Sequence, residues 1–177
     1  AELILVEERV DPRGVARTDY DSIFVVRKDS KLNSLDDLIK NAKDLNFTFT
    51  SPTSTSGFVY ANYRLVKEGL LKPGQDPKTV FRRVSFGGSY TQALEEVLAG
   101  RADACAVSYY TVEGPKAAKY LSAEKISQLR VLARTPGVPT HLITARSGLS
   151  EALKTRVKKA LLKLSAEKPE ILEDVYG

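Results

Sequence analysis

Short runs of apolar and β-branched residues alternate along the chain with longer segments whose apolar residues recur at helical spacing. This alternation is typical of an α/β protein, in which helices cover a mostly parallel or mixed sheet. The pattern predicts strands at residues 3–6, 22–26, 47–50, 80–86, 102–107, 131–133 and 142–144. It predicts helices that begin after Ser34, near Ser54, at Tyr90, between residues 111 and 129, and at Ser150.

Residues that start and stop helices support these boundaries. Ser34 can cap a helix whose positive first turn carries Asp36 and Asp37. Gly69 and Gly100 follow two predicted helices at the position where glycine commonly ends a helix. The helical segments therefore have definite ends.

The order of the strands predicts how the sheet is built. Residues 102–107 are small, which is typical of a central strand covered on both faces. Residues 136–139 contain two prolines and are expected to form a loop between the last two strands. We expect a five-stranded sheet over about Tyr20 to Ala145 with helices on both faces. Residues 3–6 and the helix after Ser150 should pack outside this sheet.

Composition excludes several function classes. The 177 residues, 42% of them hydrophobic, suffice for one ordinary domain or two small lobes. The 27 Lys and Arg residues exceed the 22 Asp and Glu residues by five, a mild basic balance that does not by itself indicate nucleic-acid binding. One cysteine, Cys105, and one histidine, His141, exclude an intrachain disulfide framework and a multi-cysteine zinc site.

The sequence contains no signal for membrane insertion. No apolar run approaches the ~20 residues that a membrane span requires, and the first ten residues are too acidic for a secretory signal. We expect that any targeting segment was removed or never belonged to this chain. The lack of any methionine suggests that Ala1 is not the first residue of the encoded protein.

The strongest local signal is the turn Ser54-Thr55-Ser56-Gly57, which follows a predicted strand and opens a predicted helix. Three hydroxyls and unpaired backbone N–H groups at the positive end of a helix can hold an anion such as a phosphoryl group. Helix capping is the alternative, and for an isolated match it is the more common role of Ser and Thr. The turn is not a Walker loop, because the lysine and the spacing of that motif are absent.

A second strand-to-helix turn of the same kind is Gly87-Gly88-Ser89-Tyr90. Such turns lie at the carboxyl ends of strands, where open α/β sheets bind ligands, so we expect the two turns on one rim. An ordinary glycine loop is the alternative. Tyr109 and Tyr110 emerge at the same rim and could line a pocket, although paired tyrosines are more often ordinary packing.

The residues give no support for catalysis. Paired carboxylates, a Ser-His-Asp order or a metal-ligand cluster cannot be assembled from the sequence, so we expect no catalytic residue, no cofactor and no metal. Cys105 is interpreted as a small buried hydrophobe. The basic residues between Lys154 and Lys163 are interpreted as the solvated face of the last helix.

Six segments occur together in the order and spacing of one known family. They are Tyr20–Ser30, Leu35–Leu38, Ser51–Phe58, Phe86–Ser89, Leu98–Val107 and Arg134–Pro139. With these segments the chain resembles the phosphonate-binding solute receptors of bacterial ABC importers over nearly its whole length. The resemblance implies an α/β fold of the type II periplasmic-binding-protein kind, with a mixed, mostly parallel sheet and a ligand held between two lobes.

The resemblance also implies a function and its partners. The chain would belong to an extracytoplasmic or periplasmic receptor that binds a phosphorus oxyanion, namely a phosphonate, phosphite or phosphate, and delivers it to a membrane ABC permease. No nucleic acid and no membrane insertion of this segment are implied.

The family's anion site gives roles to particular residues of this chain. Tyr20 and the turn residues Ser54, Thr55 and Ser56 match the family's pattern. Tyr90 stands where members often have a histidine, and it can donate a hydrogen bond but adds no positive charge.

Two further positions bear on the ligand's substituent. Members that bind an aminoalkyl phosphonate hold its ammonium group with two acids, and this chain has Tyr110 and His141 at those positions. The resemblance therefore implies a ligand without an amine, such as phosphite, a methylphosphonate or phosphate.

The resemblance divides the chain into parts of two lobes. Residues 1–19 are expected to be a remnant of the first lobe, residues 20–145 the second lobe, and residues 146–177 C-terminal helices that belong to the first lobe. About half of the family's first lobe, before the segment that matches Leu3 onward, has no counterpart here.

Two alternatives keep this fold and change the function class. The domain could be the ligand-binding sensor of a signalling protein, in which closure on the ligand is transmitted as a signal. An enzyme on the same fold would need a general acid or nucleophile, for which Tyr90, Tyr110 and His141 are weak candidates.

Overall fold

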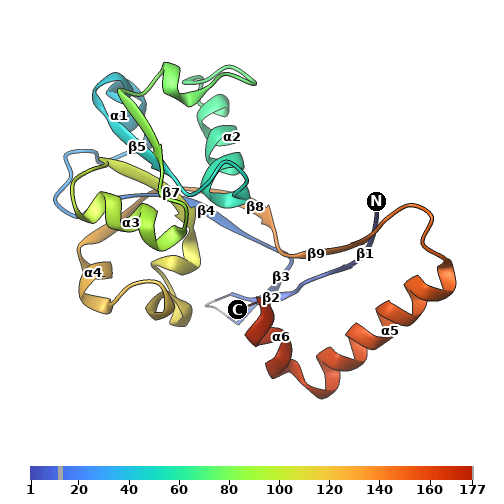
Figure 1. The fold of residues 1–177 in the computed structure, drawn as a ribbon. Helices are drawn as coiled ribbons and strands as arrows, with labels where there is room; N and C mark the ends of the chain where they lie inside the picture. The colour runs from blue at the N-terminus through green and yellow to red at the C-terminus, as the bar shows by residue number, and fades with distance from the viewer. Residues whose placement is uncertain (12–13, 177) are drawn as a thin grey trace. The chain divides into compact units, whose positions relative to one another are not determined.

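The computed structural model describes residues 1–11 and 14–176, which form two compact units (Figure 1). The first, here called the terminal unit, contains residues 1–19 and 139–177. The second, here called the sheet unit, contains residues 20–138. The sheet unit thus runs from Tyr20 to Val138.

The sheet unit is built on a five-stranded mixed sheet with the strand order β6-β5-β7-β4-β8. The strands are β4 (Asp19–Arg27), β5 (Asn46–Phe49), β6 (Arg83–Phe86), β7 (Ala104–Ser108) and β8 (Leu129–Pro139). Strand β5 pairs in parallel with β6 and β7, whereas β4 pairs antiparallel with β7. The α/β class expected from the sequence is confirmed.

Helices cover both faces of this sheet. The α-helices of the unit are α1 (Leu35–Lys40), α2 (Tyr60–Lys67), α3 (Tyr90–Leu98) and α4 (Ala123–Ser127). A single π-helical turn, η2 (Thr55–Val59), leads directly into α2, and short 3-10 turns are η1 (Ala42–Asp44), η3 (Pro77–Thr79), η4 (Tyr109–Thr111) and η5 (Pro115–Lys119).

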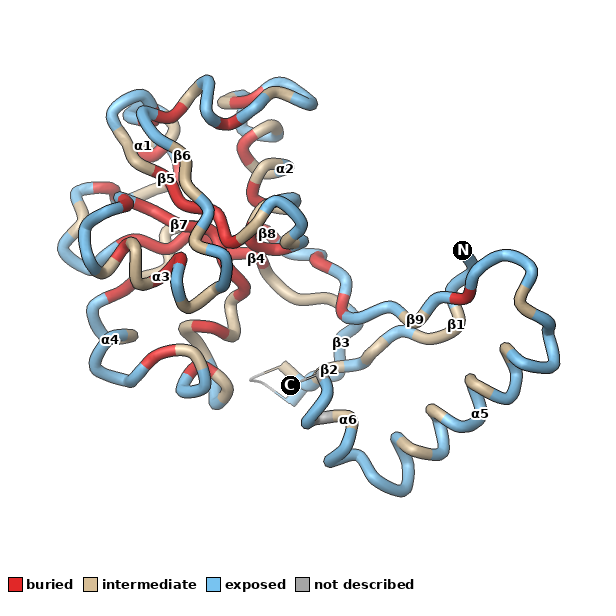
Figure 2. Tube along the Cα trace, in the orientation of Figure 1, coloured by how far each residue is buried: buried red, intermediate tan, exposed pale blue. Residues whose placement is uncertain are grey.

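Alternation along the strands divides the core between the two faces. Phe24 and Val26 of β4 point into a cluster with side chains of α1 and α2, among them Leu65. Ile23 and Val25 point to the opposite face and pack with side chains of α3. Figure 2 shows the buried residues concentrated along the central strands of this unit. Cys105 is fully buried there, as expected of a small hydrophobe.

Local sequence explains where the helices begin and end. The Ser34 hydroxyl accepts a hydrogen bond from the Asp37 amide, while the Asp37 carboxylate accepts one from the Ser34 amide, which completes a capping box. Gly69 and Gly100 have φ angles of 80° and 71°, a left-handed conformation that glycine adopts without strain as it ends a helix.

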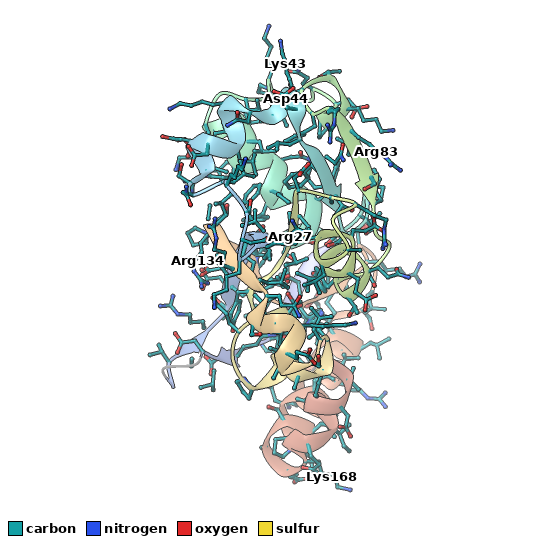
Figure 3. All side chains as sticks on the ribbon, turned by 90° about the vertical axis from the view of Figure 1, so that its left-hand side faces the viewer. Arg27, Lys43, Asp44, Arg83, Arg134 and Lys168 are labelled. Atoms are coloured by element: carbon teal, nitrogen blue, oxygen red, sulfur yellow. The ribbon has the colours of Figure 1, made fainter. Side chains whose placement is uncertain are left out.

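The segment Pro136–Pro139, expected to be a loop, belongs instead to strand β8. Proline cannot donate to a strand ladder, but β8 is an edge strand of the sheet, where a missing donor is tolerated. Arg134 of this strand pairs with Asp21 and Glu113, and it is labelled in Figure 3 with Arg83 of the other edge strand.

The terminal unit contains the two ends of the chain. Strand β1 (Glu2–Val6) pairs antiparallel with β9 (Leu142–Ala145), and β2 (Arg9–Val10) pairs antiparallel with β3 (Ala16–Arg17). Helices α5 (Glu151–Glu167) and α6 (Pro169–Tyr176) follow. Residues 142–145 were expected in the main sheet, but their hydrogen bonds to β1 place them in the terminal unit.

We expect the core beneath α2 to contribute much of the stability of the sheet unit. Leu65 is fully buried, so Leu65→Ala should lower the free energy of unfolding by about 2–5 kcal/mol, because it removes packed methyl groups and leaves a cavity. Tyr63 lies on the same helix and is 56% exposed, so Tyr63→Ala is the matched control and should change stability little. Urea unfolding followed by circular dichroism measures both, and equal losses would contradict the assignment of Leu65 to the core.

Candidate functional site

The turn after β5 is fixed by its own hydroxyl groups. The Ser54 hydroxyl accepts a hydrogen bond from the Gly57 amide at 3.0 Å, and the Ser54 carbonyl accepts from the amides of Phe58 and Val59. The buried Ser56 is also bonded to the sheet, because its carbonyl accepts a hydrogen bond of 2.7 Å from the Ser22 hydroxyl on β4. The capping role expected for this turn is therefore present.

Gly57 is required by a close approach of the turn to the sheet. A Cβ atom at this position would lie 2.2 Å from the Thr50 Oγ1 atom and 2.5 Å from the Thr50 Cβ atom, far inside normal contact. The Thr50 amide donates to the Gly57 carbonyl, and the Thr50 hydroxyl donates to the Ala106 carbonyl on β7. The glycine thus lets the turn rest directly on Thr50, the residue that follows β5.

The Gly87-Gly88 turn meets the same strand end. The Gly87 amide donates to the Phe49 carbonyl at 2.9 Å, and the Gly88 amide donates to the Thr50 carbonyl at 2.7 Å. The Ser89 hydroxyl caps α3 by accepting from the Gln92 amide. The two turns come together as expected, but these two amides bond to the carbonyls of Phe49 and Thr50 instead of offering free donors. The main effect of the second turn is to position Tyr90.

Three hydroxyl groups from three elements meet in what we call the hydroxyl cluster: Ser56, Tyr90 and Ser108. The Ser56 Oγ atom lies 2.7 Å from the Tyr90 hydroxyl and 2.7 Å from the Ser108 Oγ atom. The Ser108 hydroxyl donates to the Tyr90 hydroxyl at 3.2 Å. Ser56 and Ser108 are fully buried, and Tyr90 is half-buried. Each side chain of the cluster is therefore fixed by the other two.

Four tyrosine rings, here called the tyrosine group, adjoin this cluster: Tyr20, Tyr90, Tyr110 and Tyr120. The Tyr110 ring is central, with centroids 5.6 Å from Tyr20, 6.1 Å from Tyr90 and 5.8 Å from Tyr120. Tyr90 and Tyr120 lie 6.3 Å apart. These distances are those of tilted and edge-to-face aromatic pairs. The group supplies apolar ring faces together with phenolic hydroxyls and contains no charged side chain.

Burial and hydrogen bonding shift two tyrosines in opposite directions. Burial alone would raise the pKa of Tyr90, but hydrogen bonds with Ser108, Ser56 and Ser54 outweigh it and lower the pKa. Burial raises the pKa of Tyr110, and neighbouring Tyr90 adds to the effect. Tyr90 is thus the more acidic of the two hydroxyls.

The structure brings most of the predicted site residues together. Tyr20, Tyr90 and Tyr110 belong to the tyrosine group, and Ser54 and Ser56 belong to the turn that contacts it. Thr55 is exposed and lies between these two serines in the same turn.

Sequence reasoning missed two residues of this site, Ser108 and Tyr120. Ser108 is a small polar residue at the carboxyl end of a buried strand, directly before Tyr109-Tyr110, and that position could have identified it. Tyr120 follows η5 in a stretch whose helical pattern gives no comparable signal.

His141 belongs to the terminal unit, where it has a carboxylate neighbour. Its Nδ1 atom lies 2.8 Å from the Glu7 Oε2 atom and 3.2 Å from the Arg9 Nη2 atom, and its amide donates to the Glu7 carboxylate. Arg9 also pairs with Glu7 at 2.9 Å. Burial opposes ionisation of Glu7, but the hydrogen bonds from Arg9 and His141 outweigh it and hold its pKa below the ordinary value.

Among residues 1–11 and 14–176, no group of three or more His, Cys, Asp and Glu side chains is placed to hold a metal ion. Within that same part of the chain, no helix combines the length and the apolarity needed to cross a membrane.

Comparison with known proteins identifies the family. The profile of a family described as "ABC transporter, phosphonate, periplasmic substrate-binding protein" matches residues 1–177. The chain belongs to this family. Its members are periplasmic substrate-binding proteins of ABC transporters. The resemblance inferred from the six sequence segments is therefore confirmed.

Individual relatives agree with this assignment. The phosphonates-binding periplasmic protein of Escherichia coli (strain K12) is 32% identical over 138 residues, which cover 78% of this chain and 38% of that protein. The binding-protein component of an ABC phosphonate transporter from Pseudomonas aeruginosa has a TM-score of 0.70 at 26% identity, covering 96% of this chain and 53% of the other. A Prochlorococcus marinus (MIT 9301) protein in complex with methylphosphonate has a TM-score of 0.65 at 25% identity, covering 92% and 58%.

These structures confirm the expected periplasmic-binding-protein fold. The chain spans less than two thirds of the length of each of these family relatives.

The environment of Glu7 predicts a pH dependence for the terminal unit. Because the folded-state pKa of Glu7 lies below 4.5, its stabilising contribution is present above about pH 4.5 and is lost as the pH falls through the folded pKa. Glu7→Gln should therefore destabilise the protein at pH 7 and have little effect at pH 2, measured by thermal unfolding. Glu8→Gln, at the exposed neighbouring position, is the control. A Glu7 carboxyl carbon that titrates at or above pH 4.5 in NMR would refute this account.

Proposed function

We propose that this chain is the ligand-holding part of an extracytoplasmic receptor that binds a phosphorus oxyanion and passes it to an ABC permease. The observation that carries the proposal is the hydroxyl cluster of Ser56, Tyr90 and Ser108, fixed against the Ser54–Gly57 turn. Oxyanions accept hydrogen bonds, and fixed hydroxyl donors at a helix start can hold them without a full counter-charge.

The relatives support a phosphorus oxyanion as the ligand. The Escherichia coli protein is named for phosphonates, and the Prochlorococcus marinus protein holds methylphosphonate. In this chain we assign the anionic oxygens to Ser54, Thr55, Ser56 and Tyr90, with Tyr20 beside them. This set offers hydroxyl donors and no cation, which favours a small oxyanion over a larger, multiply charged ligand.

The opposite end of the ligand would face Tyr110 and His141. Tyr110 is packed among other aromatic rings, and His141 is engaged by Glu7. Neither supplies a carboxylate for an ammonium group. A ligand with a small uncharged substituent, such as phosphite, methylphosphonate or phosphate, fits these surroundings better than an aminoalkyl phosphonate.

The remaining assignments follow from the same proposal. The sheet unit would form most of the second lobe, and the terminal unit would contribute β1 and the C-terminal helices to the first lobe. The receptor would act in the periplasm or another extracytoplasmic compartment, without a catalytic role. Membership of a transport family favours a permease partner over the signalling alternative.

Replacing Thr55 tests the turn directly. Thr55→Ala should weaken methylphosphonate binding by about 1–3 kcal/mol, because it removes one hydrogen bond to a charged group. Thr53→Ala is the matched control, since Thr53 is an exposed threonine of the same loop whose hydroxyl lies 3.4 Å from the Ser51 hydroxyl. Calorimetry on a protein that retains both lobes measures both affinities. Unchanged affinity in Thr55→Ala would leave helix capping as the role of this turn.

A ligand series tests the opposite end of the site. Because a buried ammonium group without a partner costs on the order of several kcal/mol, 2-aminoethylphosphonate should bind more weakly than phosphite or methylphosphonate at pH 7. Titrating the three ligands side by side gives the order. If 2-aminoethylphosphonate binds most tightly, a carboxylate of the protein must pair with its ammonium group, and the inferred ligand class is wrong.

A further inference from the structure

A groove lined by other residues lies between α2, the segment after it and edge strand β6 of the sheet unit. Its volume is about 430 Å³, within the range of small-molecule sites. None of its lining residues belongs to the hydroxyl cluster or to the tyrosine group. The proposed transport function therefore gives this groove no role.

The walls of the groove are apolar. They are formed by Phe58, Val66, Leu71, Val84 and Phe86. The rings of Phe58 and Phe86 lie 5.6 Å apart, and Phe86 remains 39% exposed. An apolar guest that covered these side chains would gain free energy from the surface removed from water.

One residue that lines the groove, Asn62, has a buried polar atom without a partner among the described residues. The Oδ1 atom of Asn62, on α2, is buried and forms no hydrogen bond with any residue that the structure describes. A buried polar atom left without a hydrogen bond destabilises the protein. If the Asn62 side chain turned to meet a guest hydroxyl, this cost would be removed, and because a hydroxyl both donates and accepts, it could pair with either end of the amide.

The rim of the groove is basic. Lys72 and Lys78 line it, and among the described residues neither ammonium group has an ion-pair partner. Asp76 is the single acid in the lining, and its carboxylate accepts a hydrogen bond from the Lys78 amide. Two lysines against one aspartate leave a net positive charge at the mouth, which is complementary to an anionic group.

We propose that this groove binds a small amphiphilic anion. Its apolar body would lie against Phe58 and Phe86, a hydroxyl would pair with the Asn62 amide, and a carboxylate would face Lys72 and Lys78. The site is distinct from the oxyanion site in both chemistry and lining. It would bind its ligand whether or not a phosphonate is present.

Three related probes separate the contributions of the hydroxyl and of the carboxylate to binding in the groove. 3-(4-Hydroxyphenyl)propanoate carries the ring, the hydroxyl and the carboxylate; 3-phenylpropanoate lacks the hydroxyl; and 4-propylphenol lacks the carboxylate. Each is titrated into the ¹⁵N-labelled full chain, and backbone amide shifts are followed by NMR. We expect saturable shifts at residues 58–66, 71–78 and 84–86, with the first probe binding more tightly than either of the others.

Substitutions of Asn62 and of the two lysines test the hydroxyl contact and the carboxylate contact separately. Asn62→Leu should abolish the preference for the hydroxyl-bearing acid over 3-phenylpropanoate, a preference of about two- to tenfold for one hydrogen bond. Lys72→Gln combined with Lys78→Gln should weaken the binding of both acids but not the binding of 4-propylphenol. Lys67→Gln, an exposed lysine on α2 that does not line the groove, is the matched control.

Several results would overturn the proposal. They are a lack of saturable shifts in these segments, shifts confined to the hydroxyl cluster or the terminal unit, or an equal loss of affinity in Lys67→Gln. Because no phosphonate is used, the outcome does not depend on the proposed transport function.

Discussion

Ser56 joins four elements of the sheet unit through one side chain and one carbonyl group. Its hydroxyl meets Tyr90 at the start of α3 and Ser108 at the end of β7, while its carbonyl accepts a hydrogen bond from Ser22 on β4. The residue itself lies in η2, the turn that leads into α2. The positions of Tyr20, Thr55 and Tyr90 depend on this junction, because these residues lie on β4, η2 and α3, three of the elements that Ser56 connects.

Close backbone packing makes this junction possible. Gly57 leaves the turn in contact with Thr50, where a Cβ atom would lie 2.2 Å from the Thr50 hydroxyl oxygen. Gly87 does the same for the second turn, since a Cβ atom there would lie 2.6 Å from the Ala93 amide nitrogen. The two glycines bring hydroxyl-bearing residues to one strand end. The result is a rigid arrangement of neutral donors, which suits an oxyanion whose charge is met by hydrogen bonds.

Local sequence predicted the features that local interactions determine. The capping serines Ser34, Ser54 and Ser89 could be found because a cap is formed by residues three or four positions apart. Long-range pairing could not be found in this way. Residues 142–145 read as a strand of the main sheet, but no pattern along the chain shows that their partner is β1. The pattern predicted a loop at residues 136–139 because these residues contain two prolines. An edge strand tolerates proline, but the sequence does not show that these residues lie at the edge of the sheet.

The site was predicted to a similar extent. The six segments located the turn and Tyr20, and the resemblance added Tyr90 and Tyr110, whereas Ser108 and Tyr120 join the site through contacts across the fold. The central claim is that the hydroxyl cluster and its turn hold a phosphorus oxyanion, and a crystal structure of a two-lobed protein with methylphosphonate tests it most directly. The account predicts phosphonate oxygens within about 2.5–3.0 Å of the hydroxyls of Thr55 and Tyr90. A phosphonate bound elsewhere, with Ser56, Tyr90 and Ser108 bonded only to one another, would contradict it.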